Sequence, residues 1–193
     1  MASESMNFLE ELENSVRRQK EAKERFEKGM TEENFREMFE LQKVYDDRVF
    51  REFGIRDVEE RRWEAAWLDE LGELNHELKS RWCWWKKTQK PENRDKVLEE
   101  LVDVWHFGLM YMHKYGDRRI DWPVKLYNEM KGIIAMSGWM PADCVGESQD
   151  EYDDYMAINL IGLSASCGFT MTEVYEAYKK KNAENHARMD RGY

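Results

Sequence analysis

The chain is poor in the residues that interrupt helices, since only 3 of its 193 residues are proline. It also has little of the alternation between β-branched and polar residues that marks half-buried strands. Charged residues make up 36% of the sequence and aromatic residues 13%. This composition favours amphipathic helices over sheet or disorder. The length is sufficient for one domain with a sizeable core.

Long hydrophobic runs are also missing. The longest, residues 156–169, contains Asn159 together with serine and glycine interruptions, and it is too short to cross a bilayer. The first 14 residues carry four glutamates and lack the basic start of a signal peptide. We therefore expect a soluble protein with no membrane partner.

Cysteine is scarce and positive charge is in deficit. Cys83, Cys144 and Cys167 have no C-x-x-C spacing, which favours a reducing, cytoplasmic setting in which each thiol is a small buried hydrophobe. The 40 acidic residues outnumber the 30 lysines and arginines, giving a net charge of −10. Nucleic acid is not expected as a partner, because its phosphate backbone needs a basic face. A small anionic substrate is compatible with this charge if metal ions compensate it.

Hydrophobic periodicity and capping signals predict an all-α bundle of about six or seven helices. Residues 1–30 should form a charged helical extension, and residues 31–193 a single domain. Within that domain, residues 120–150 are less regular. The expected helices run from a cap at Thr31 to Gly54, from a capping box at Asp57 to residues 83–87, from a cap at Asn93 to Gly116, over about 150–166, and from a capping box at Thr170 onward.

Two acidic pairs occupy helix positions that would normally face neighbouring helices with apolar side chains. Glu70 and Glu73 share one predicted helix, and Glu100 and Asp103 share the next. Carboxylates three residues apart lie on one helix face, so two packed helices would direct four of them into one space. Such charge must be neutralised by protons or cations. Mg²⁺ is the favoured cation, because it takes oxygen ligands and often shares them with a phosphate-bearing substrate.

Two other interpretations of these acids stay open at this point. Glu73-x-x-His76 and Asp103-x-x-His106 have the spacing found in di-iron carboxylate bundles, although the preceding helix offers no clear further donor beyond nearby Asp46. Alternatively, the acids lie on the surface of a non-catalytic helical interaction protein, since exposed helices are rich in glutamate.

Aromatic and cationic side chains could complete a nucleotide site. Three tryptophans cluster with lysines within residues 82–87, where rings can stack on bases and ammonium groups can neutralise phosphates. Lys181, Asn185 and Arg188 share one stripe of the last helix and supply a point charge, an amide and a two-pronged clamp. The plainer alternatives are a hydrophobic plug and a basic helix that balances its own dipole. Together with the acids, these groups suit hydrolysis of a magnesium–nucleoside triphosphate.

Five motifs follow one another between Leu41 and the C-terminus. They are Leu41–Asp46, Trp67–Glu73, Trp82–Lys86, Glu100–Phe107 and Tyr178–Arg188, the last closing on Gly192 and Tyr193. In this order they resemble the motifs of the dimeric all-α deoxyuridine triphosphatases found in kinetoplastids, some bacteria and phages of Gram-positive hosts. That family lies within the all-α nucleoside triphosphate pyrophosphohydrolase superfamily. Asp46 departs from the pattern, because many relatives have asparagine there.

The resemblance implies a homodimer that hydrolyses dUTP, with dUDP as a further candidate substrate, to supply dUMP and to clear dUTP from the nucleotide pool. It implies Mg²⁺ as cofactor, with activation of the water by either Glu70 or Glu73. It also implies that residues 31–193 are the catalytic domain and that the irregular stretch 120–150 is a mobile insert that closes onto bound substrate. The nearest alternative is a related pyrophosphohydrolase acting on dCTP or a modified nucleotide. The implied metal ligands are Glu70, Glu73, Glu100 and Asp103, and the implied substrate-binding residues are Gln42, Trp84, Lys86, Lys181, Asn185 and Arg188.

Overall fold

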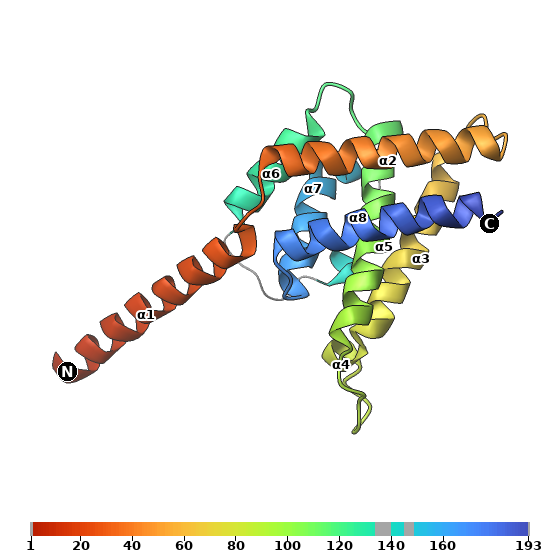
Figure 1. The fold of residues 1–193 in the computed structure, drawn as a ribbon. Coiled ribbons are helices and arrows are strands. Elements are labelled where there is room, and N and C mark those ends of the chain that lie inside the picture. The colour runs from red at the N-terminus through yellow and green to blue at the C-terminus, as the bar shows by residue number, and fades with distance from the viewer. Residues whose placement is uncertain (1, 134–139, 145–148, 193) are drawn as a thin grey trace.

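The computed structural model describes residues 2–133, 140–144 and 149–192, and all regular structure within them is helical. The all-α prediction is therefore confirmed, with eight α-helices in the described residues once the four-residue α4 is included. The elements are α1 (Ala2–Glu27), α2 (Glu32–Glu52), α3 (Glu60–Glu77), α4 (Lys79–Trp82), α5 (Arg94–Lys114), α6 (Trp122–Gly132), the 3-10 helix η1 (Pro141–Cys144), α7 (Gln149–Ser166) and α8 (Met171–Asp190) (Figure 1).

Helix α5 lies at the centre of the bundle and packs against α2, α3, α7 and α8 (Figure 1). Its side chains Leu101, Trp105 and Leu109 are fully buried. Gly108 allows α7 to approach closely, because a Cβ atom there would lie 2.8 Å from Cδ1 of Leu160. Because four helices pack against α5, its rotation about its own axis is fixed, and so is the direction in which its remaining side chains point.

Side-chain caps fix the starts of three helices where the sequence predicts them. Thr31 and Asn34 form a reciprocal capping box at the start of α2, and Thr170 and Glu173 form another at the start of α8. The side chain of Asn93 accepts hydrogen bonds from the first backbone N–H groups of α5. These bonds satisfy amide groups that have no partner within the helix.

Helix α3 departs from the prediction at both ends. The predicted cap at Asp57 is wrong: its carboxylate accepts a 2.9 Å hydrogen bond from the adjacent N–H of Val58, and Glu59 precedes the helix without a side-chain cap. The helix also stops at Glu77, before the predicted 83–87, because Leu78 leaves the helical conformation at φ −85° and ψ 15°. The chain then re-enters helix as the short α4.

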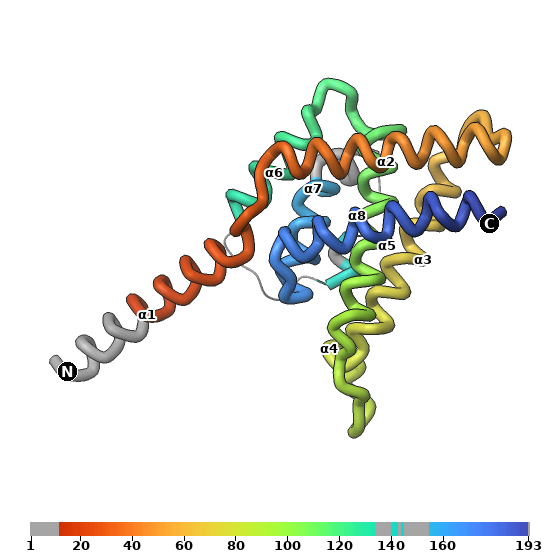
Figure 2. Tube along the Cα trace, viewed as in Figure 1, coloured from red at the N-terminus to blue at the C-terminus, as the bar shows by residue number. Residues whose placement is uncertain are grey.

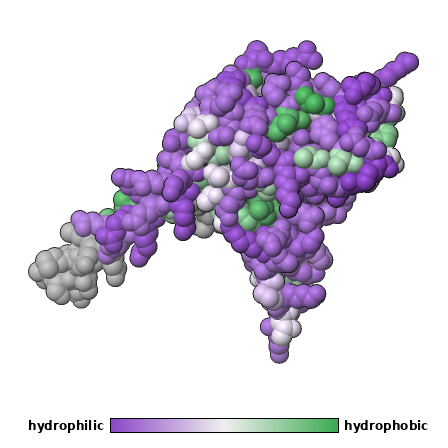
Figure 3. Space-filling view, in the orientation of Figure 1, coloured by the Kyte–Doolittle hydropathy of each residue, from purple (hydrophilic) through white to green (hydrophobic). Residues whose placement is uncertain are grey.

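Helix α1 projects away from the body of the molecule, as Figures 1 and 2 show. Its outer side chains Leu12 and Val16 are exposed, whereas Phe26 and the following Met30 are buried in the core. The visible face of the molecule is largely hydrophilic, with hydrophobic residues in small separate patches (Figure 3). The sequence predicts a peripheral helix here but not this anchor at its C-terminal end.

The stretch 120–150 contains α6 and η1, and its predicted mobility falls partly on residues outside the described ranges. Among the described residues, no helix combines the length and apolarity needed to span a membrane. Cys83, Cys144 and Cys167 are buried, and Cys83 and Cys167 form no disulfide bond within the described residues.

Candidate active site

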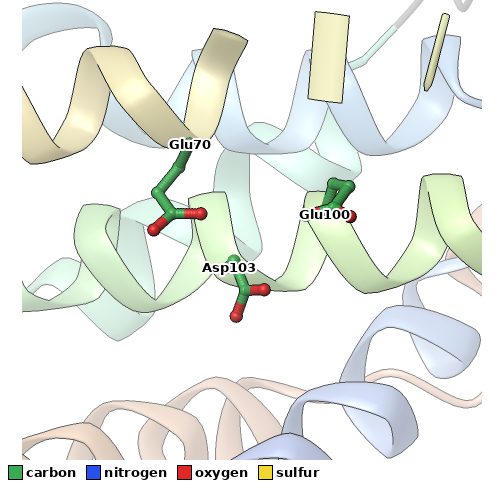
Figure 4. Close-up of side chains that lie close together, drawn as sticks. All are labelled: Glu70, Glu100 and Asp103. Atoms are coloured by element: carbon green, nitrogen blue, oxygen red, sulfur yellow. The ribbon is translucent and has the colours of Figure 1, made fainter. Parts of the chain in front are cut away.

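Three carboxylates converge between α3 and α5. Glu70 extends from α3 toward α5, which carries Glu100 and Asp103, and one oxygen atom of each lies within 4.8 Å of those of the other two (Figure 4). The buried row of α3 runs from its tryptophans through Leu71 and Leu74. The sequence pattern placed Glu70 in this row, but the structure does not. Glu70 therefore lies at the edge of the packed face, half-buried, where its carboxylate reaches a cavity.

Glu73 lies next to this trio on α3. It is exposed, and its negative charge contributes to the raised pKa of Glu100. We refer to Glu70, Glu73, Glu100 and Asp103 as the carboxylate quartet. No histidine of the described residues joins the converging trio, so the spacing that suggests a di-iron site is not matched by convergence in space.

Burial and the charges of neighbouring carboxylates raise the pKa values of Glu70, Glu100 and Asp103. Burial, followed by the negative charges of Asp103 and Glu73, raises the pKa of Glu70 from 4.5 to about 7. Burial, followed by the charges of Glu73 and Asp103, raises the pKa of Glu100 to about 7 as well. Burial also raises the pKa of Asp103, although a hydrogen bond from Lys181 opposes the rise. An all-oxygen set with this excess of negative charge fits a hard divalent cation such as Mg²⁺.

A cavity of about 610 Å³ opens beside the quartet, which is within the usual range for small-molecule sites. Glu100 lies outside its lining but shares a neighbouring hollow with Glu73. The polar residues that line the cavity are Gln42, Tyr45, Asp46, Arg62, Glu70, Glu73, Asp103, His106, Lys181, Asn185 and Arg188, and the apolar ones include Val49, Phe50, Ile55 and Phe107.

Helix α8 brings cations to the same cavity. Lys181 donates a 2.6 Å hydrogen bond from Nζ to Oδ2 of Asp103. Arg188 lies two turns further along, with its Nε 3.6 Å from Oε1 of Glu184 on its own helix. Lys181, Asn185 and Arg188 thus lie on one side of α8, facing the acids of α3 and α5 across the cavity.

Gln42 is at the centre of a buried hydrogen-bond network. Its Oε1 accepts from the hydroxyl of Tyr178 at 2.9 Å and from Nδ1 of His106 at 2.7 Å. Its Nε2 donates to Oδ1 of Asp46 at 2.7 Å. Because Oε1 can only accept, the ring proton of His106 is on Nδ1. Burial lowers the pKa of His106 to about 3, so the ring is neutral and Nε2 is an acceptor.

Two buried acceptors remain at this network. Nε2 of His106 and Oδ2 of Asp46 have no hydrogen-bond partner within the described part of the chain, although Oδ2 lies 3.6 Å from Nδ1 of His113. Sequence reasoning singled out Gln42 and flagged Asp46, and their spacing of four residues was a usable signal. It considered His106 only within the spacing of a possible di-iron site, and it connected neither His106 nor Tyr178 to Gln42.

Two of the residues assigned to substrate binding lie elsewhere. Trp84 and Lys86 follow α4 in the loop that leads to α5, and neither lines the cavity of its own chain. Trp84 is 88% exposed, and Lys86 is also exposed. Of the six predicted substrate-binding residues, the structure brings together Gln42, Lys181, Asn185 and Arg188.

The sequence was compared with known proteins. A family model described as dUTPase matches residues 34–193. The match includes all five motifs and every member of the carboxylate quartet, and it leaves α1 outside. No curated protein matches the chain.

Proposed function

Because this chain belongs to the all-α dUTPase family, it hydrolyses dUTP to dUMP and pyrophosphate, and we propose that the reaction depends on Mg²⁺ held by the carboxylate quartet. The supporting observation is the convergence of three carboxylate oxygens beside a cavity of nucleotide size. A divalent cation bound there would polarise phosphate oxygens and lower the pKa of a bound water.

The chain's own residues would divide the remaining tasks. Lys181, Asn185 and Arg188 face the quartet and would bind the phosphates, while the aromatic and aliphatic part of the lining would exclude water from the base. Either Glu70 or Glu73 would accept a proton from the attacking water.

Pyrophosphate release from a panel of deoxynucleoside triphosphates, with phosphate release from dUDP measured alongside, tests the proposal. Turnover of dUTP should require Mg²⁺ and stop with a chelator. Turnover that persists after complete chelation would rule out the metal role, and equal turnover of all bases would rule out uracil selectivity.

Comparison of Glu70→Gln with Glu73→Gln shows which of the two residues accepts the proton of the attacking water. A variant that loses only the proton acceptor should still bind Mg²⁺, as measured by calorimetry, while losing kcat. A variant that loses a ligand should bind Mg²⁺ more weakly as well. Equal behaviour of the two variants in both assays would show that neither has a separate role.

The buried carboxylate of Asp46 could accept a hydrogen bond from cytosine as well as from uracil, which makes dCTP a second candidate substrate. A free carboxylate oxygen can accept a hydrogen bond from N3–H of uracil or from the amino group of cytosine. The Asp46→Asn variant can instead donate to O4 of uracil, so its ratio of dCTP to dUTP turnover should fall below that of the wild type. An unchanged ratio would exclude Asp46 from base selection.

We further propose a cytoplasmic homodimer in which Trp84 and Lys86 serve the cavity of the partner subunit, because both lie outside the cavity of their own chain. Glu70→Gln and Trp84→Ala subunits should each be impaired alone. A mixed dimer contains one cavity with both defects and one with neither, so mixing should restore activity. Failure of mixing to restore activity in verified mixed dimers would exclude the shared cavity. The buried Cys83 and Cys167, which form no disulfide bond within the described residues, fit a reducing compartment.

A further inference from the structure

Lys181 and Asp103 form an ion pair inside the cavity, between a residue expected to bind phosphate and a residue expected to bind metal. Nζ of Lys181 lies 2.6 Å from Oδ2 of Asp103 and 3.9 Å from Oε1 of Glu99. The two paired side chains are only 17% and 19% exposed. Water therefore screens this pair less than it would screen a surface pair.

We propose that Lys181 is a positioning residue whose ammonium group pairs with Asp103 while Mg²⁺ is absent. When Mg²⁺ binds to Asp103, Lys181 is released to the triphosphate. This inference rests on the proposed role of the quartet as a metal site. It assigns Lys181 two successive partners, the carboxylate first and the substrate phosphates second.

The two cations compete for one carboxylate. Mg²⁺ requires close, nearly octahedral oxygen ligands, and Asp103 is one of the three residues whose oxygens converge. An ammonium group hydrogen-bonded to the same carboxylate repels an arriving divalent cation and occupies part of its acceptor capacity. Metal binding therefore weakens the contact between Lys181 and Asp103.

The released ammonium has a suitable new partner nearby. Lysine is a point charge on a flexible four-carbon stem and can turn without movement of its helix. Asn185 and Arg188 line the same cavity from α8, so phosphates bound there would lie within reach of Lys181. Before metal binds, Asp103 holds this cation away from the phosphates.

Positive coupling between metal and nucleotide follows. Mg²⁺ frees Lys181 for the triphosphate, and the triphosphate, by attracting Lys181, frees Asp103 for Mg²⁺. Thermodynamic linkage requires that each ligand strengthens the other by the same factor. Part of this factor depends on the charge of Lys181, beyond the direct attraction between metal and phosphate.

The test is calorimetric titration of Mg²⁺ into the full chain at about pH 8, alone and with a non-hydrolysable α,β-imido analogue of dUTP. Lys181→Met keeps the length of the stem without its charge, and Lys180→Met changes the exposed neighbouring lysine on the same helix. Thermal unfolding of each variant checks that it is folded, and Lys181→Arg, which retains a cation, serves as a second variant.

In Lys181→Met, Mg²⁺ alone should bind about 5- to 10-fold more tightly than in the wild type. In the wild type, the nucleotide analogue should raise the Mg²⁺ affinity by a factor of about 5 to 150, the usual range for coupled sites, and in Lys181→Met this factor should be smaller. Lys180→Met should match the wild type, and Lys181→Arg should retain most of the coupling. Unchanged Mg²⁺ affinity and coupling in folded Lys181→Met would overturn the inference alone. Failure of the wild type to bind Mg²⁺ would overturn the proposed metal site.

Discussion

Replacement of Glu70 by glutamine should stabilise the metal-free protein while removing its activity. In the folded protein the pKa of Glu70 is raised from 4.5 to about 7 by burial and by neighbouring carboxylates. A shift of that size corresponds to about 3 kcal/mol of preference for the protonated form. Solvent screening at this half-buried side chain reduces the expected penalty of ionisation to about 1–2 kcal/mol.

The sign of the effect depends on pH. Because the folded state binds the Glu70 proton more tightly than the unfolded state, ionisation penalises folding fully above pH of about 7 and not at all below about 4.5. Glutamine is never ionised and avoids this penalty. The stabilisation by Glu70→Gln should therefore be complete at about pH 8 and should decline as pH falls through that window.

Urea unfolding followed by tryptophan fluorescence, with chelator present, measures the effect at about pH 8 and at about pH 5. The gain in the free energy of unfolding at the higher pH should be about 1–2 kcal/mol, which corresponds to about 2–8 °C in Tm for a chain of this size. Glu64→Gln, on the same helix but outside the cavity lining, is the matched control. With excess Mg²⁺ the order should reverse, because bound metal stabilises the wild type. An equal gain at both pH values, or none in chelator, would refute the reasoning.

Three further outcomes can be checked on single preparations. Alanine at Gly108, whose Cβ would lie 2.8 Å from Leu160, should destabilise the fold by about 1–3 kcal/mol. Alanine at Gly72, where a Cβ meets nothing within 4 Å, should stabilise it by about 0.5–1 kcal/mol. Denaturant unfolding that ranks the two variants the other way would contradict the packing of α5 on α7. Removal of residues 1–24 should leave kcat/KM for dUTP within about twofold of that of the full chain, because the family match begins at residue 34 and the anchors Phe26 and Met30 are retained. A large loss of kcat/KM would show that α1 contributes to the site. The thiol of Cys167, whose pKa burial raises to about 11, should react with a disulfide reagent at neutral pH only at the rate of global unfolding, and fast labelling of the native protein would show that it is accessible.

The features predicted correctly from the sequence are local ones. Thr31, Asn93 and Thr170 cap helices because each interaction spans only two or three residues. The convergence of Glu70 with Glu100 and Asp103 also follows from periodicity once two neighbouring helices are assumed to pack together. The face of α3 that is buried was less predictable, because a row shifted by one residue, through Leu71 instead of Glu70, fits the same helical periodicity.

The features that were missed depend on contacts between distant segments. The bond from Tyr178 to Gln42 joins residues 136 positions apart, and the bond from Lys181 to Asp103 joins residues 78 apart. No periodicity within one helix specifies which side chains meet across the bundle. Trp84 illustrates a different limit, because a motif can identify a residue type without showing which cavity it reaches.

The side chains joined through Gln42 form a linked pattern of donors and acceptors across three helices. Exchanging one member for a residue of opposite hydrogen-bonding sense would leave a buried neighbour without a partner, even when that residue never touches a ligand. Divergence at this end of the cavity should therefore require concerted replacements at positions 42, 106 and 178. A single graft at one of these three positions should harm folding before it alters selectivity, whereas asparagine at position 46 keeps an oxygen that can accept from Gln42.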